Sequence, residues 1–107
     1  MRTAQRAAPG AKVLDDVERA AKTADVLKAV AHPLRLRIVA LLCKGETQVN
    51  AIADRLGVPQ AIVSQQLRIL RMHRLVTAVR GGGYATYRLL EPRLRQLVTC
   101  MEQCSLH

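Results

Sequence analysis

Apolar residues recur at helical spacing most clearly between residues 47 and 75. Val63, Leu67 and Leu70 stand at i, i+4 and i+7, so they share one face of a predicted helix and should be buried together. A shorter apolar stripe over residues 49–56 has matching spacing and should pack against that face. This stretch therefore predicts two short helices in contact with each other.

The link between these two helices is Gly57-Val58-Pro59. Glycine suits the left-handed backbone of a tight turn, and proline suits the start of a helix, where its missing N–H costs nothing. Thr47 is expected to cap the amino end of the first helix. The pattern is that of a DNA-binding helix-turn-helix, although it also fits a plain helical hairpin of no special function.

The polar residues of the second helix mostly lie away from its apolar face. Amide, hydroxyl and guanidinium side chains are the groups that read base edges and hold phosphates in a DNA major groove. We therefore assign base contacts to Gln60, Ser64, Gln65 and Arg68, and a backbone contact to Arg71.

Two further helices are predicted before this unit. A narrow stripe of small apolar residues over about 12–30 predicts one helix, which His32-Pro33 ends because the residue before proline avoids helical backbone. Pro33 then starts a helix that reaches about Cys43 and stops at Gly45.

After the helix-turn-helix the periodicity changes from helical to alternating. Residues 76–80 and 84–89 predict a hairpin with a flexible tip at Gly81-Gly82-Gly83. A hairpin that directly follows a recognition helix is typical of a wing, so the expected fold is a winged helix-turn-helix, mainly α with a β-hairpin. Arg80 and Tyr84, on either side of the tip, are assigned to the DNA backbone.

A last helix is predicted from Pro92 to Cys104. Its apolar face is too large for the core that remains in so small a domain, so we expect it to pair with its own copy and with the first helix across a two-fold axis. Such a homodimer would place two recognition helices about one DNA turn apart, on an inverted repeat. The residues of this face are Leu94, Leu97, Val98 and Met101.

The charge of the chain favours a polyanionic partner. Seventeen lysines and arginines stand against eight acidic residues, a formal charge of +9, although a basic surplus can also serve solubility alone. Aromatic residues make up only 2%, which argues against stacking on RNA or single-stranded DNA. Double-stranded DNA is therefore the expected partner.

Length and apolar content set the remaining expectations. The 107 residues predict one domain over 11–107, after a flexible basic arm at 1–10. No apolar run approaches the ~20 residues of a membrane span, and the first residues lack the apolar segment of a secretory signal, so a cytoplasmic location is expected. The sequence contains no convergent catalytic set, so we do not expect an enzyme.

Several of these motifs, in this order, resemble the ArsR/SmtB family of winged-helix metalloregulatory repressors. The resemblance covers roughly residues 20–104. It implies a homodimer that represses its own operon and leaves DNA when an inducer binds. The matching residues are the stretch 26–42 around His32-Pro33-Leu34-Arg35, the segment 63–70, Leu75-Val76, and the wing with Tyr84 and Tyr87.

Two inducer sites known in that family match this sequence poorly. The resemblance would place a Cys-x-Cys type motif in the stretch from Glu46 to Ala51, which contains no cysteine. It would also place the ligands of a zinc sensor at positions that form a poor zinc set, namely Glu91, Arg93, Cys104 and His107.

Three cysteines remain as candidate ligands: Cys43, Cys100 and Cys104. Cys100 and Cys104 are spaced i, i+4, which stacks two sulfurs on one helix face, and Cys43 could add a third from the same or the facing subunit. Three thiolates without a fourth strong donor suit a three-coordinate ion with a lone pair, so As(III) or Sb(III) is the expected inducer. The alternative is that Cys43 is a buried small hydrophobe and that Cys100 and Cys104 are two unrelated thiols.

Two other functions stay open. A thiol redox or persulfide-sensing repressor of the same fold would pair Cys43 with Cys100 or Cys104, although the resemblance places the sensing cysteine of that helix at Ala40. A disulfide between Cys100 and Cys104 is disfavoured because their Cβ vectors run parallel. A purely architectural DNA-binding protein with structural cysteines would respond to no inducer.

Overall fold

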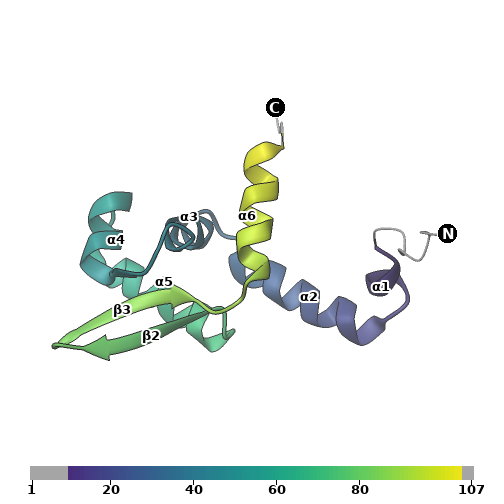
Figure 1. The fold of residues 1–107 in the computed structure, drawn as a ribbon, viewed down its shortest axis with the longest axis horizontal. Coiled ribbons are helices and arrows are strands. Elements are labelled where there is room, and N and C mark those ends of the chain that lie inside the picture. Colours follow the sequence, from purple (N-terminus) through teal and green to yellow (C-terminus); the bar gives the residue numbers. More distant parts are fainter. Residues whose placement is uncertain (1–9, 105–107) are drawn as a thin grey trace.

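Six helices and three short strands make up the part of the chain described by the computed structural model, residues 10–104. Apart from Gly10, the predicted arm at 1–10 lies outside the described residues. In Figure 1 α4, α5 and the β2–β3 hairpin lie together, α2 leads away from them, and α6 stands close to α3. The predicted winged helix-turn-helix is confirmed. The elements are α1 (Ala11–Leu14), α2 (Val17–Val30), α3 (Pro33–Leu42), β1 (Thr47–Gln48), α4 (Val49–Leu56), α5 (Gln60–Met72), β2 (Val76–Gly81), β3 (Tyr84–Leu89) and α6 (Arg93–Gln103).

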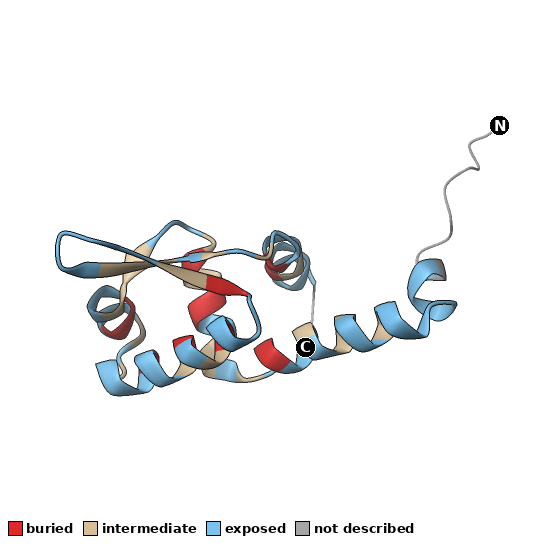
Figure 2. Cartoon of the chain, turned by 90° about the horizontal axis from the view of Figure 1, so that it is seen from below, coloured by how far each residue is buried: buried red, intermediate tan, exposed pale blue. Residues whose placement is uncertain are grey.

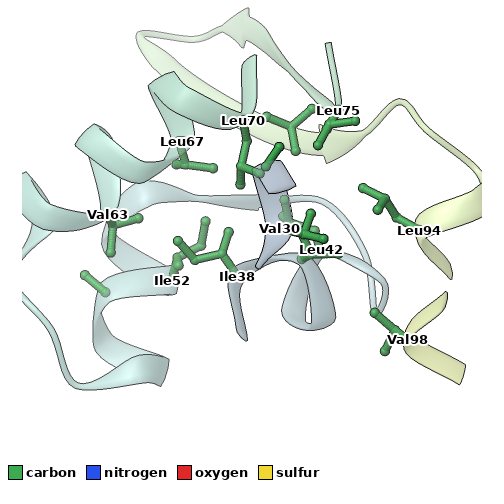
Figure 3. Packing of buried hydrophobic residues seen from close by; sticks show 14 residues of the cluster. Val30, Ile38, Leu42, Ile52, Val63, Leu67, Leu70, Leu75, Leu94 and Val98 are labelled. Atoms are coloured by element: carbon green, nitrogen blue, oxygen red, sulfur yellow. The ribbon is translucent and has the colours of Figure 1, made fainter. Parts of the chain in front are cut away.

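The apolar stripe of α5 lies at the centre of the core. Val63, Leu67 and Leu70 are each 0% exposed, as the sequence predicts. Ile38 of α3 and Ile52 of α4 are equally buried beside them (Figure 3). Burial of one such side chain stabilises the fold by roughly 1.5–3 kcal/mol. This packing fixes the rotation of α5 about its own axis and so decides which of its side chains face outward.

The single helix predicted over 12–30 is interrupted before Val17. Asp16 has extended backbone, and its carboxylate accepts a hydrogen bond from the N–H of Arg19 at 3.0 Å, so it caps the amino end of α2. The prediction of one continuous helix was wrong because Asp16 can start a new helix here. Its carboxylate satisfies an N–H group in the first turn of α2 that would otherwise need a preceding helical turn as its partner.

The amino end of α4 also differs from the prediction. Thr47 is not the N-cap; it forms β1 with Gln48 and pairs with Tyr87 of β3. Gln48 takes the cap position without a side-chain hydrogen bond. The sequence prediction was wrong because the partner of Thr47 lies forty residues further along the chain, beyond the reach of local capping rules. The sheet therefore has three strands in the order β1-β3-β2.

The wing has a tighter tip than the sequence predicts. Gly81 belongs to β2 and pairs with Tyr84, so the turn consists of Gly82 and Gly83, with φ of 59° and 83°. Positive φ at both central residues is typical of the hairpin turn that follows the natural twist of two antiparallel strands.

The last helix, α6, begins one residue later and ends one residue earlier than predicted. Glu91 caps its amino end, accepting hydrogen bonds from the backbone N–H of Arg93 at 3.1 Å and from the guanidinium Nε at 2.8 Å. These hydrogen bonds lower the pKa of Glu91 to about 2. At the other end, Cys104 follows the helix with extended backbone.

The amino-terminal helices leave apolar side chains uncovered. Val17 and Leu27 of α2 are 85% and 48% exposed. Within α2, the buried residues lie at the carboxyl end (Figure 2), and they are Ala29 and Val30.

Within residues 10–104 the structure contains no helix with the length and apolar content to cross a membrane.

Replacing Arg74 with glycine should stabilise the protein. Arg74 follows α5 with a φ of 59°, a conformation in which a Cβ atom is strained. We expect the free energy of unfolding in urea to rise by roughly 0.5–1 kcal/mol. Arg68→Gly removes the same charge from within α5 and should instead lower it by about 1 kcal/mol. Equal destabilisation by both changes would contradict this assignment.

Candidate nucleic-acid interface and thiol site

The outer face of α5 carries the side chains assigned to DNA bases. Because its apolar stripe points into the core, the residues on its other side are held outward. The helix is 13 residues long, and the major groove of duplex DNA admits a helix presented in this way. All five predicted contact residues of α5 are exposed: Gln60, Ser64, Gln65, Arg68 and Arg71.

The wing places its two predicted contact residues near the same surface. Arg80 and Tyr84 are exposed close to the tip of the hairpin. Tyr84 borders an open hollow of about 360 Å³ between the wing and the amino ends of α4 and α5. This hollow is open to solvent. Its lining residues are Gln48, Val49, Asn50, Gln60, Gly83, Tyr84 and Ala85.

Sequence reasoning missed Gln48 and Asn50 as candidate contacts. Both lie at the start of α4, and their amide groups are of the types that bind phosphates and bases. Their place at this hollow depends on the pairing of β1 with β3, which no local pattern indicates. The available signal for these two contacts was the amino end of α4, where no side chain caps the helix. To use that signal, the N-cap has to be placed at Gln48 and not at Thr47.

The segment that forms the helix-turn-helix and the wing is strongly basic. Between residues 47 and 90, six arginines stand against a single acidic residue, Asp54. All six are exposed. Such a charge excess attracts phosphates and gives binding that weakens as salt increases. The arginines are Arg55, Arg68, Arg71, Arg74, Arg80 and Arg88.

The three cysteines lie in two different environments. Cys100 and Cys104 are exposed free thiols, one turn apart at the end of α6. Cys104 is the first residue after the helix, so the second thiol is carried by backbone that is no longer helical. Cys43 follows α3, where its half-buried side chain packs against the core.

Cys43 approaches a different side of α6 from the one that carries the other two cysteines. Arg95 donates a hydrogen bond from Nη1 to the backbone oxygen of Cys43 at 2.6 Å. Burial raises the pKa of the Cys43 thiol, which Arg95 opposes and the nearby Glu102 reinforces. At about 100° per helical residue, Arg95 and Glu102 share one side of α6, and Cys100 and Cys104 lie roughly opposite.

The structure therefore does not bring the three thiols together within one chain. Among the described residues, no three His, Cys, Asp or Glu side chains form a group that could hold a metal ion. The zinc set implied by the resemblance is also poor here, because Arg93 engages the carboxylate of Glu91. The remaining ligand, His107, lies outside the described residues.

An exposed polar recognition helix, an arginine-rich helix-turn-helix and a wing define a winged-helix DNA-binding regulator. A family model described as "Bacterial regulatory protein, arsR family" matches residues 32–78, which run from the N-cap of α3 into β2. The chain is 38% identical over 88 residues to the biofilm growth-associated repressor of Xylella fastidiosa, covering 81% of this chain and 77% of that protein. This protein therefore belongs to the arsR family of bacterial regulatory proteins.

Other relatives and solved structures agree with this assignment. Identity to the HTH-type transcriptional regulator NmtR of Mycobacterium tuberculosis is 39% over 83 residues, which covers 78% of this chain and 69% of that protein. The crystal structure of the repressor BigR from Xylella fastidiosa superposes with a TM-score of 0.79 at 35% identity, covering 86% of this chain and 96% of that one. A homodimeric winged helix-turn-helix domain from Mycobacterium bovis superposes with a TM-score of 0.69 at 32% identity, with coverage of 94% and 88%.

Replacing Arg80 with alanine should remove one phosphate contact. We expect affinity to fall alike for all duplex sequences, and the slope of log K against log salt to become shallower by about one. Fluorescence anisotropy at several salt concentrations measures both. Arg19→Ala, which removes the same charge from an ion pair with Asp16 at the start of α2, should leave the slope unchanged. An unchanged slope for Arg80→Ala would exclude that residue from the interface.

Proposed function

We propose that this protein is a homodimeric repressor that binds an inverted repeat in duplex DNA and is released by trivalent arsenic or antimony. The ion would bind cysteine thiolates at the end of α6. The observation that carries the inducer assignment is the pair of exposed free thiols, Cys100 and Cys104, one turn apart. A named repressor and a homodimeric DNA-binding domain among the relatives support the rest.

Uncovered apolar groups on α2 and α6 support the homodimer. Leu27 is 48% and Met101 40% exposed. Leu27 also lines an apolar hollow of about 160 Å³ between these helices, with Val26, Leu94 and Leu97 among its other walls. Covering such a surface with the same helices of a second copy removes it from water on both sides of a two-fold axis.

Replacing Leu27 with lysine should therefore weaken the dimer. A charged side chain at the centre of an apolar contact costs several kcal/mol if it stays unpaired. Sedimentation velocity at micromolar concentration should then show monomer where the unchanged protein is a dimer. Val79→Lys introduces the same charge at a position that is also 48% exposed, on the wing, and should leave the dimer intact. A monomeric unchanged protein would contradict the proposal.

The chemistry of the thiols supports a soft, thiophilic inducer. Thiolates prefer soft ions, whereas hard ions prefer oxygen ligands. Cys100 and Cys104 are accessible from solvent, so an ion can reach them without local unfolding. Cys43 lies on the other side of α6 in its own chain, so a third thiolate from Cys43 would have to come from the partner subunit.

The packing of α6 gives a route from the thiols to DNA. Leu94 and Val98 of α6 are buried in the same core as Ile38 of α3, which contacts the recognition helix (Figure 3). Arg95 adds a hydrogen bond to the end of α3. A change in how the two α6 helices meet would therefore change the separation of the two α5 helices. Release requires only that the liganded dimer binds DNA less tightly than the free one.

Replacing Cys100 or Cys104 with serine should separate DNA binding from release. Both variants should bind the operator like the unchanged protein, because neither thiol lies near α5 or the wing. Neither should be released by arsenite or antimonite at concentrations that release the unchanged protein. Anisotropy of a labelled operator measures both properties. Release of both variants by metalloid would disprove the inducer site. Release of the unchanged protein by peroxide or persulfide, but not by metalloid, would favour the redox alternative.

A further inference from the structure

A second hollow lies away from the surface assigned to DNA. It has a volume of about 190 Å³ and opens between α3, the carboxyl end of α4 and the carboxyl end of α6. Among the described residues, none from α5 or the wing lines it, and neither does any cysteine. The hollow is therefore distinct both from the candidate DNA interface and from the thiol pair.

Three exposed cations border this hollow. Arg37 lies in the middle of α3, Lys44 follows the end of that helix, and Arg55 comes from the last turn of α4. Cations are stabilising at the carboxyl end of a helix, which accounts for Lys44 and Arg55 but not for Arg37. Within residues 10–104 none of the three lies within ion-pair distance of a carboxylate. Their charges are thus available to a ligand.

The rest of the lining is apolar apart from one carboxylate. Ala40, Leu41 and Leu56 are half-buried and pack against the core, so they offer carbon surface beside the charged groups. Glu102 is the only acid among the described lining residues, and it lies close enough to Cys43 to raise the pKa of that thiol. Three positive charges and one negative charge leave the lining with a net charge of +2.

We propose that this hollow binds the phosphate monoester of a small organic molecule. A phosphate monoester carries a charge of about −1.5 to −2 at pH 7, which matches the charge of the lining. The planar guanidinium groups of Arg37 and Arg55 suit paired phosphate oxygens, and Lys44 adds a point charge. The organic group contacts the apolar lining. Because the hollow is smaller than the roughly 300–1,000 Å³ of sites for drug-sized molecules, that group is small.

A ligand in this hollow would contact parts of the fold that have different roles. α4 is the first helix of the helix-turn-helix, and α6 carries the thiols and part of the expected dimer contact. The hollow brings the ends of both helices beside α3. The inference goes beyond the proposed function and does not depend on it, because metalloid binding involves none of these cations.

The test is an NMR titration of the ¹⁵N-labelled unchanged protein with phenyl phosphate at physiological salt. Backbone amide shifts locate the bound molecule, and we expect saturating shifts at Ala40, Leu41 and Leu56. Inorganic phosphate lacks the organic group and benzoate carries only one charge. Each should therefore bind roughly tenfold more weakly than phenyl phosphate.

Variants of exposed side chains test the cations individually. Arg37→Gln and Arg55→Gln should each weaken phenyl phosphate binding about tenfold, because each removes a charged donor. Arg88→Gln removes an exposed arginine from β3 in the wing and should leave the shifts in the hollow unchanged. Glu102→Gln should strengthen binding, since it removes the one opposing charge of the lining.

Four results would overturn the proposal. Shifts confined to Gln60 and Tyr84 would place phosphate on the DNA-binding surface alone. Equal affinity for inorganic phosphate would exclude an organic ligand. Absent phenyl phosphate binding, together with lower operator affinity and a shallower salt slope for Arg37→Gln, would assign the cations to DNA. A Glu102→Gln variant that is less stable to urea and binds phenyl phosphate no better would make Glu102 the partner of these cations.

Discussion

Val63, Leu67 and Leu70 of α5 are packed against Ile38 of α3 and Ile52 of α4, and this contact determines what the protein presents to DNA. A helix that can rotate about its axis offers no fixed set of side chains to a groove. Here the inward face is fully buried, so the outward face is fixed by default. The exposed amides and arginines of α5 need no hydrogen bonds of their own to be positioned, which leaves their donors free for phosphates and bases.

Much of this arrangement follows from the sequence because it depends on local rules. Helical spacing predicts the buried stripe of α5, and Gly57, with φ of 70°, forms the turn that the sequence predicts. The features that sequence reasoning missed depend on distant contacts or on competition between caps. Thr47 pairs with a strand far along the chain, and Asp16 starts a helix where apolar spacing alone predicts continuity.

The thiol site illustrates the same division. Spacing predicts that Cys100 and Cys104 lie one turn apart, and the structure agrees except that the helix ends just before the second. Spacing cannot predict the side of α6 on which Cys43 falls, because that depends on how α6 packs against α3. The hydrogen bond from Arg95 to the Cys43 carbonyl reveals this packing. It separates the three candidate ligands into an exposed pair and one half-buried thiol, and this distinction limits the chemistry that one chain can perform.

The short strand β1 has a mechanical consequence for regulation. Thr47 and Gln48 pair with Tyr87 and Thr86, so the strand joins the first residue of α4 to the wing by backbone hydrogen bonds. The wing and the helix-turn-helix consequently form one rigid DNA-binding unit, whose internal shape changes little when an inducer binds at the end of α6. The inducer must then act on the distance and angle between the two DNA-binding units of the dimer. A single unit without its partner should accordingly not respond to the inducer, however well it recognises its half of the operator.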